Sequence, residues 1–179
     1  LVSKFMNTCI SADRSPRTTL PAIVLLDNVR SLYNTGAFFR TADAVGVEKL
    51  VLCGITPRPD QGGRQARAIA KTALGSENSV PWAYEPDTPV ALERIRRSGY
   101  QIAIAETAPD ATDLFAWEPT WPLCVVFGHE VTAVRPAVGW DGVIYVRVPM
   151  FGAKTSLNVA TAGGVVLYEL LRKRLAGGR

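Results

Sequence analysis

Five short apolar runs constrain the fold of this 179-residue chain more than any other feature. They are AIVLL (22–26), KLVLC (49–53), QIAIA (101–105), LCVVF (123–127) and VIYVRV (143–148). Apolar runs of this length are typical of strands that are buried on both faces of a sheet. Because helix-like segments lie between them, we expect an α/β fold with a mainly parallel sheet flanked by helices.

Two segments in the first half of the chain carry helical signals. Residues 35–46 place apolar side chains at i, i+4 and i+7, and Gly46 stands where a helix would end. Residues 66–74 have a similar pattern. The apolar stripe of the first helix consists of Phe38, Ala42 and Val45.

The second half predicts two more helices. Residues 87–99 have Asp87 as a candidate N-cap and Gly99 as a stop. A last helix is expected from about Ser156, and its basic end suits the negative pole of a helix dipole. Residues 1–20 show no periodicity, so we expect an N-terminal arm followed by a single domain at 21–179.

Composition excludes several classes of protein. Hydrophobic residues make up 47% and charged residues 20% of the chain, which excludes disorder as the main interpretation. The longest uncharged apolar stretch, 155–168, is shorter than the roughly 18 to 20 residues that cross a bilayer. The first ten residues lack the features of a secretory signal. We therefore expect a cytoplasmic protein with no membrane span.

The cysteines, the histidine and the distribution of charge further limit the kinds of site and partner that we expect. Cys53 and Cys124 lie in apolar runs and are expected to be buried thiols, and a single histidine, His129, cannot build a multi-histidine metal site. We expect no metal. Residues 1–75 carry 10 Lys and Arg against 5 Asp and Glu, within a net charge of +4. This surplus favours a polyanionic partner, although a merely soluble basic surface fits the charge equally well.

Binding sites in parallel sheets form beyond the carboxyl ends of the strands, so the residues after each run are the place to look for chemistry. Three such segments stand out, at 26–47, 127–131 and 148–169. None contains GxGxxG after the first strand or GxxxxGK[ST], which argues against a dinucleotide fold or a P-loop. Ser156 is not in a GxSxG turn, which weakens a hydrolase interpretation.

The three segments together resemble the SpoU/TrmH-type RNA 2'-O-ribose methyltransferases of the SPOUT superfamily. The matches are Asn34-x-Gly36-x-x-x-Arg40-Thr41-Ala42, Gly128-x-Glu130, and Pro149-Met150 followed by Ser156-Leu157-Asn158-Val159. The resemblance extends over about residues 22–174. It implies a C-terminal trefoil knot, which periodicity could not show, together with S-adenosylmethionine (AdoMet) as cofactor, a tRNA or rRNA substrate, and a homodimer.

The resemblance also assigns residue roles. Arg40 matches the arginine that activates the ribose hydroxyl, whereas a random exposed helix arginine would simply be solvated. A guanidinium stays protonated at neutral pH and is therefore a poor acceptor for the hydroxyl proton, so Arg40 is expected to act electrostatically. The implied catalytic set is Arg40, Asn34, Glu130, Ser156 and Asn158, and the implied cofactor-binding set is Gly128, Val148 and Leu157.

Several of these residues have simpler alternatives. Asn34 can cap exposed amides at a tight turn, where Gly36 allows the backbone to approach closely. Glu130 can be a helix-capping carboxylate instead of a partner for Arg40. Ser156 can be a helix N-cap. The second motif continues as GHEVTAV, where the family usually has glycines, so His129 and Ala133 put cofactor affinity in question. His129 is expected to be a structural loop residue.

The basic residues and the last helix bear on how the chain would bind RNA and form a dimer. We expect no separate N-terminal RNA-binding domain of the kind that many relatives carry, so RNA recognition would rest on the arm and on a basic surface. That surface includes Arg14, Arg17, Arg58, Arg64, Arg67 and Lys71. The last helix has more apolar positions than one face can bury, and its small residues Ala162, Gly163 and Gly164 would admit a partner helix. A dimer could place Arg40 or the arm beside the partner's cofactor.

We therefore expect AdoMet-dependent methylation of a ribose 2'-hydroxyl in tRNA or rRNA. The alternative is a catalytically silent RNA-binding protein of the same fold, in which the altered second motif has abolished cofactor binding. A hydrolase that uses Ser156 and His129 lacks an acid partner and the nucleophile turn.

Overall fold

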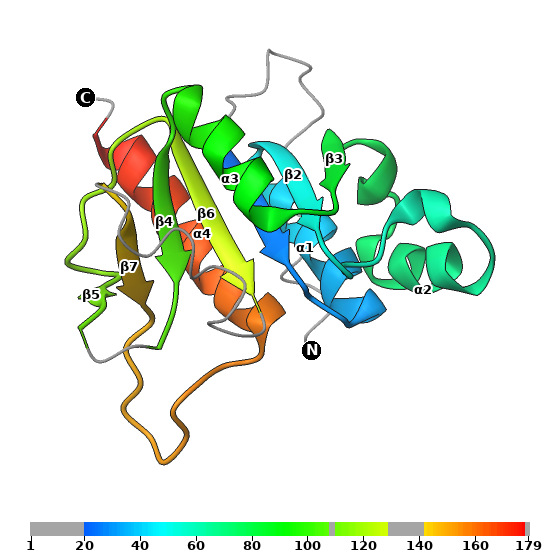
Figure 1. The fold of residues 1–179 in the computed structure, drawn as a ribbon. Coiled ribbons are helices and arrows are strands. Elements are labelled where there is room, and N and C mark those ends of the chain that lie inside the picture. Colours follow the sequence, from blue (N-terminus) through cyan, green and yellow to red (C-terminus); the bar gives the residue numbers. More distant parts are fainter. Residues whose placement is uncertain (1–19, 108–109, 129–141, 178–179) are drawn as a thin grey trace.

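The computed structural model describes residues 20–107, 110–128 and 142–177. They form a seven-stranded sheet of order β3-β2-β1-β6-β4-β7-β5, in which every strand pair is parallel (Figure 1). The strands are β1 (Leu20–Asp27), β2 (Val47–Cys53), β3 (Trp82–Glu85), β4 (Gln101–Ala105), β5 (Thr112–Asp113), β6 (Leu123–Gly128) and β7 (Ile144–Arg147). The prediction of an α/β fold with a parallel sheet is confirmed.

The five predicted runs are β1, β2, β4, β6 and β7, and the two strands that the sequence did not predict, β3 and β5, lie at the sheet edges. Edge strands are partly exposed, so neither one presents a continuous apolar run. Strand β1 begins at Leu20, inside the segment predicted as the arm, and residues 1–19 of that arm lie outside the described residues. The predicted trefoil knot stays a prediction.

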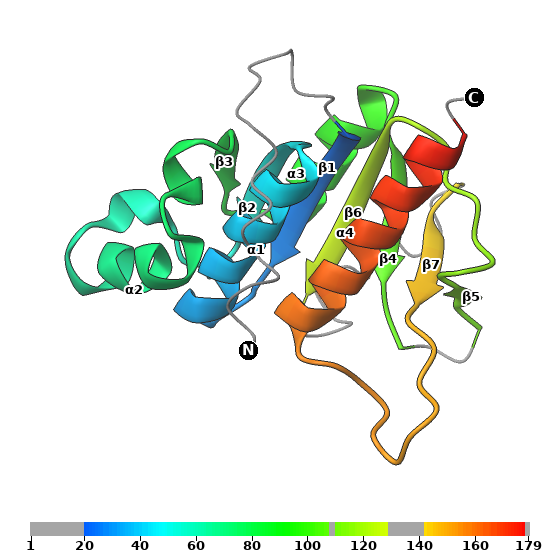
Figure 2. The same ribbon diagram turned by 180° about the vertical axis from the view of Figure 1, so that it is seen from behind.

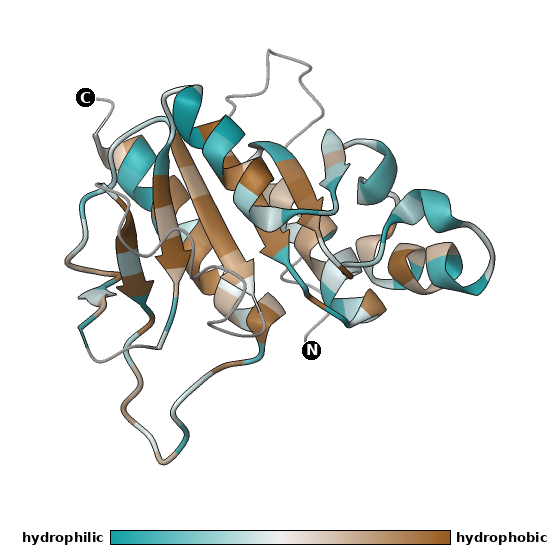
Figure 3. Ribbon diagram, in the orientation of Figure 1, coloured by the Kyte–Doolittle hydropathy of each residue, from teal (hydrophilic) through white to brown (hydrophobic). Residues whose placement is uncertain are grey.

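Helices cover both faces of the sheet. They are α1 (Leu32–Val45), α2 (Gly63–Ala73), α3 (Thr88–Arg97) and α4 (Val159–Ala176), with short 3₁₀ turns at Pro59–Gln61 and Ser76–Asn78. Figures 1 and 2 show α3 on one face and α1 and α4 on the other. Apolar strands lie at the centre, and hydrophilic stretches lie on α2 and α3 (Figure 3).

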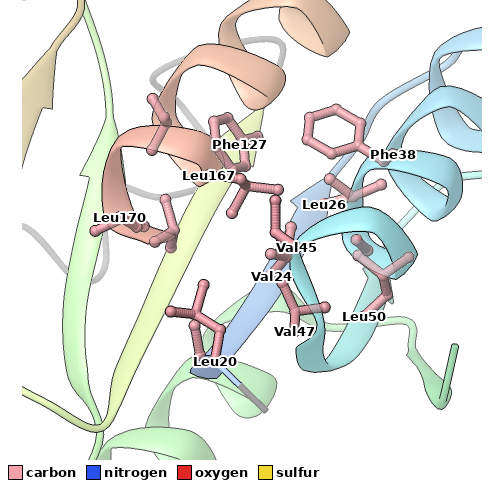
Figure 4. Packing of buried hydrophobic residues seen from close by; sticks show 14 of the residues in the cluster. Leu20, Val24, Leu26, Phe38, Val45, Val47, Leu50, Phe127, Leu167 and Leu170 are labelled. Atoms are coloured by element: carbon pink, nitrogen blue, oxygen red, sulfur yellow. The ribbon is translucent and has the colours of Figure 1, made fainter. Parts of the chain in front are cut away.

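The larger half of the core joins β1 and β6 to α1 and α4. Phe38 of α1 packs against Phe127 of β6 with ring centroids 5.1 Å apart, and Leu167 of α4 lies in the same cluster (Figure 4). A second cluster, on the other face, holds Cys53 and Cys124 among the side chains under α3. Both thiols are buried, as predicted, and burial raises the pKa of the Cys53 thiol to about 12.

Helix ends agree with the sequence in some places and correct it in others. Gly46 ends α1 in the left-handed conformation with φ 68°, and the Asp87 side chain caps α3 by accepting from the Val90 amide at 3.1 Å, as predicted. The N-cap of α1, however, is Ser31 and not Asn34, which lies inside the first turn.

The start of α4 is a second correction. The helix begins at Val159, three residues later than predicted, and its N-cap is Asn158 instead of Ser156. The Asn158 side chain accepts from the amides of Ala160 and Thr161 at 2.9 and 3.4 Å. Asn and Ser are about equally good caps, so sequence preference alone could not separate the two positions.

One glycine of α4, Gly163, packs within the chain, whereas the sequence suggested contact with a partner helix. A Cβ atom on Gly163 would overlap the ring of Phe38, so this glycine lets α4 approach α1 of the same chain. Gly164 faces open space. Within the described parts of the chain, no helix is long and apolar enough to cross a membrane.

Candidate active site

A pocket of about 610 Å³ opens at the carboxyl ends of the central strands, as the crevice rule predicts. This volume falls within the roughly 300 to 1,000 Å³ of small-molecule sites. The ends of β4, β6 and β7 and the first turns of α1 and α4 form its walls. The segment between β7 and α4 extends beyond this edge of the sheet (Figure 1).

Six of the predicted site residues line this pocket. They come from all three motifs and are Asn34, Gly128, Val148, Ser156, Leu157 and Asn158. Arg40 does not line it: its exposed side chain lies six residues beyond Asn34 on α1, about 9 Å along the helix axis. Glu130, His129 and Ala133 lie outside the described residues.

The first and third motifs meet through two asparagines. Asn158 Nδ2 donates to Asn34 Oδ1 at 3.4 Å, while Asn158 Oδ1 caps α4. The start of α1 is fixed by Ser31, whose Oγ accepts from the Asn34 amide at 3.3 Å. Two helix N-termini therefore point toward one pocket, and both carry partial positive charge.

Gly36 of the first motif is a packing residue and not a pocket residue. A Cβ atom there would overlap Thr72 Oγ1 and the carbonyl oxygen of Ile69. Thr72 Oγ1 also donates to the Tyr33 carbonyl oxygen at 3.0 Å. The predicted close approach is thus between α1 and α2, and it fixes α2 beside the first turn of α1.

Gly128 ends the central strand β6, and its backbone lines the pocket. A Cβ atom on Gly128 would come within 3.3 Å of the Asp27 carbonyl oxygen, which is tighter than ordinary packing. The paired ends of β1 and β6 therefore leave little room for a side chain there. The predicted need for glycine has this structural cause in addition to backbone access.

Asp27 lies directly behind Gly128 and is completely buried. Burial raises the pKa of its carboxyl above the ordinary 3.8, and hydrogen bonds from Thr88 and Asn28 offset that rise only in part. Among the described residues, its second oxygen, Oδ2, has no hydrogen-bond partner. Asp27 is a costly buried acid beside Gly128 that does not itself line the pocket, and no signal in the sequence pointed to it.

Other pocket residues received no role from the sequence. Arg30 and Ser31 follow β1, Glu106 and Thr107 follow β4, and Met150 follows β7. Arg30, Ser31 and Met150 lie within the segments 26–47 and 148–169, whereas Glu106 and Thr107 follow β4, an end that those segments leave out although binding sites form beyond every strand end. Glu106 and Arg30 bring one acidic and one basic side chain to the pocket.

The arrangement suits binding and positioning more than hydrolysis. Ser156 is exposed, and no hydrogen bond joins its hydroxyl to a base in the described part of the chain. No group of three or more His, Cys, Asp or Glu side chains that could hold a metal occurs there either. The pocket combines apolar walls with polar groups from two helix starts, which is typical of a small-molecule or cofactor site.

The chain is similar to known proteins in both sequence and fold. The chain is 32% identical over 157 residues to the Vibrio vulnificus 23S rRNA (guanosine-2'-O-)-methyltransferase RlmB, covering 87% of this chain and 61% of that protein. The A. aeolicus TrmH/SpoU tRNA modifying enzyme superimposes with a TM-score of 0.76 at 28% identity, over 89% of this chain and 78% of that one. AviRb from Streptomyces viridochromogenes, in complex with AdoMet, superimposes with a TM-score of 0.71 at 28% identity. The match covers 88% of this chain and 58% of AviRb.

The chain spans about three fifths of the length of the curated relatives it matches. The model of the SpoU rRNA methylase family matches residues 21–168, which include all three motifs and every described residue that lines the pocket. The same residues form the parallel sheet shared with the solved relatives. The chain belongs to the SpoU rRNA methylase family, within the SPOUT superfamily.

Proposed function

We propose that this chain is an AdoMet-dependent RNA methyltransferase that methylates a ribose 2'-hydroxyl in tRNA or rRNA. The observation that carries this proposal is the meeting of the three motifs in one pocket, where Asn34 contacts Asn158 and both lie near Gly128. Relatives named as 2'-O-methyltransferases and a relative in complex with AdoMet support it. The buried free thiols Cys53 and Cys124 suit the reducing cytoplasm that we propose as its location.

The pocket residues fit AdoMet chemically. Apolar walls that include Phe127, Val148 and Leu157 suit an adenine ring, and the backbone at Gly128 is open to the pocket. The helix starts and Arg30 suit a carboxylate, and the carboxylate of Glu106 suits an ammonium or ribose hydroxyls. When bound, AdoMet supplies an electrophilic methyl group on a sulfonium.

A ribose hydroxyl is a poor nucleophile, so the protein must align it and stabilise the negative charge that develops on its oxygen. We assign this role to Arg40, which would hold the 2'-oxygen and the adjacent phosphate by charge. The oxygen–carbon bond forms as the carbon–sulfur bond breaks, and the proton leaves to a phosphate oxygen or water. Asn34, Ser156 and Asn158 would orient the ribose, and Glu130 would orient Arg40.

Arg40 lies outside its own pocket, which favours a homodimer in which it serves the partner's pocket. On α4, the side chains of Tyr168 and Leu175 are 55% and 61% exposed, and a second copy of the chain could cover both. The fit of Gly163 against Phe38 removes one of the reasons for a dimer that the sequence offered. The exposed apolar residues and the position of Arg40 are the remaining support.

Calorimetry with AdoMet tests the cofactor site. We expect binding, and we expect Ala162→Leu, which adds bulk to the pocket wall, to weaken it at least about tenfold. Thr161→Leu is the matched control, because the neighbouring Thr161 is exposed and does not line the pocket. No binding at millimolar AdoMet would favour the catalytically silent alternative.

The identity of the RNA is a separate question. Mass spectrometry of tRNA and rRNA from a strain that lacks the gene would identify the nucleotide that loses its 2'-O-methyl group. Loss of a base methyl group, with every ribose methyl group retained, would contradict the proposed reaction.

A further inference from the structure

An exposed aromatic side chain lies on α1 between two residues that line the pocket. Tyr33 lies in the first turn of α1 between Ser31 and Asn34, both of which line the pocket, and its side chain is 53% exposed. Its carbonyl oxygen accepts from Thr72 Oγ1, so the backbone that carries the ring is fixed to α2. A half-exposed tyrosine in a rigid turn contributes little to the core and is available to a ligand.

A cationic helix face lies beside this ring. Arg64, Arg67 and Lys71 occur at i, i+3 and i+7 on α2, so their side chains share one face. Ile69 and Ala73 are buried on the opposite face. Figure 1 shows α2 at the end of the molecule, next to the start of α1.

The charge on this face is not neutralised. Helix α2 contains no Asp or Glu, and within residues 20–107, 110–128 and 142–177 its three cations form no ion pair. The Lys71 ammonium instead lies 6.0 Å from the centre of the Tyr33 ring. By contrast, arginines on α3 and α4 pair with glutamates, as Arg97 does with Glu93 at 2.7 Å and Arg172 with Glu169 at 2.7 Å.

An aromatic ring beside cations that pair with no acid in the described part of the chain matches single-stranded nucleic acid, in which bases are free to stack and phosphates follow at regular spacing. In an A-form duplex the bases are already stacked, so such a ring has no base to accept. Tyr33 also borders the pocket into which the proposed function brings a ribose hydroxyl. A nucleotide next to the target ribose would therefore lie within reach of Tyr33.

We propose that Tyr33 stacks on an unpaired base next to the target nucleotide and that Arg64, Arg67 and Lys71 bind the adjoining phosphates. This inference rests on the proposed function and makes it narrower: the substrate is a single-stranded loop, bulge or end of RNA. Tyr33 and α2 then select RNA by its unpaired state, while the pocket performs the chemistry.

Fluorescence anisotropy tests the stacking role with two probes: labelled oligoadenylate about 12 nucleotides long, near the upper range of a single-strand site, and an RNA duplex of equal length. We expect the full 179-residue chain to bind the single strand more tightly. Tyr33→Leu should weaken single-strand binding about tenfold, Tyr33→Phe should retain it, and neither should change duplex binding. Unchanged single-strand binding by Tyr33→Leu would overturn the proposal.

Phe115→Leu is the matched control, because Phe115 is 55% exposed and lies near the opposite edge strand, β5. It should bind oligoadenylate like the unaltered chain, and an equal loss in this variant would also overturn the proposal. Light scattering accompanies each variant. A change of oligomeric state in Tyr33→Leu alone would assign Tyr33 to an interface between copies of this chain and overturn the stacking role.

The salt dependence of oligoadenylate binding tests the cations. Removing one phosphate contact lowers the slope of log affinity against log salt by about 0.7 for a single strand. Arg64→Gln and Arg67→Gln should each show this loss, whereas Arg97→Gln, which removes a paired arginine on α3, should not. Equal slopes in all three variants would overturn the assignment of α2.

The two proposals fail in different ways. If the chain neither binds AdoMet nor transfers methyl groups but still binds oligoadenylate through Tyr33, the proposed function fails and the stacking surface stands. If it methylates RNA and Tyr33→Leu changes neither the KM for RNA nor oligoadenylate binding, the function stands and the stacking surface fails.

Discussion

Asn158 has two separable roles, because one side of its amide caps α4 and the other contacts Asn34. Asn158→Asp keeps an oxygen for the cap and places a negative charge where the helix dipole favours it, but it removes the donor to Asn34. We expect this variant to unfold at an unchanged or higher temperature and to lose methyl transfer.

Asn158→Ala is the complementary variant. It removes both roles and should also cost about 1 kcal/mol of stability. Thermal unfolding and single-turnover methyl transfer, measured on both variants, separate the cap from the site. Normal turnover by Asn158→Asp would show that the contact with Asn34 has no part in the reaction.

Asp27 predicts a distinctive dependence of stability on pH. The unfolded chain releases this proton near pH 3.8, whereas the buried carboxyl of the native chain, with its raised pKa, holds it to a higher pH. Between these two values the native state binds more protons, so the contribution of Asp27 to stability falls as pH rises through its native pKa.

Asp27→Asn removes this titration and should retain an acceptor for Thr88. We expect the variant to be at least as stable as the unaltered chain at neutral pH, with the difference shrinking toward pH 3.8. Urea unfolding over a pH series measures it. A variant that loses stability at neutral pH and regains none in acid would contradict the raised pKa.

The two glycines of α4 predict opposite outcomes for the same substitution. Gly163→Ala drives a methyl group into Phe38 and should destabilise the chain by about 1 to 3 kcal/mol. Gly164→Ala meets open space and should stabilise the helix by roughly 1 kcal/mol. Chemical denaturation measures both, and equal effects of the two substitutions would show that Phe38 does not fix the separation of α1 and α4.

The sequence predicted those elements whose burial leaves a clear pattern. Strands β1, β2, β4, β6 and β7 lie inside the sheet and appear in the sequence as apolar runs, although only Val146 of β7 is buried, whereas the edge strands β3 and β5 show no such run. Helix α2 starts at Gly63, earlier than predicted, because glycines with φ of 71° and 55° at 62 and 63 form its entrance. Such backbone values leave no trace in hydrophobic periodicity.

The site was predictable to the extent that strand ends define it. Gly128 and Asn158 were found through motifs on those ends, and the pocket brings them together. The cap of α4 and the contact between Gly163 and Phe38 depend on where the helix starts and how closely it approaches α1, which the order of residues does not specify. In our proposal, the role of Arg40 depends on a second copy of the chain. Local sequence patterns do not predict how two copies assemble.

At the level of the assembled protein, the proposed homodimer predicts complementation between two inactive variants. If Arg40 serves the partner's pocket, a mixed dimer of Arg40→Ala and Asn158→Asp holds one intact site, made from the pocket of the first chain and Arg40 of the second. Because half of randomly mixed dimers are of this kind, about a quarter of the sites should be active. Methyl transfer by the mixture measures this, and no recovery after subunit exchange would place Arg40 in its own chain's site.

The most direct measurement is transfer of labelled methyl from AdoMet to tRNA and rRNA, followed by digestion to nucleosides and mass spectrometry, with the unaltered chain and Arg40→Ala side by side. We predict label on a ribose 2'-oxygen, with a rate that falls at least about a hundredfold in Arg40→Ala while AdoMet affinity stays unchanged. Label on a base, or an equal rate in Arg40→Ala, would contradict the proposed reaction.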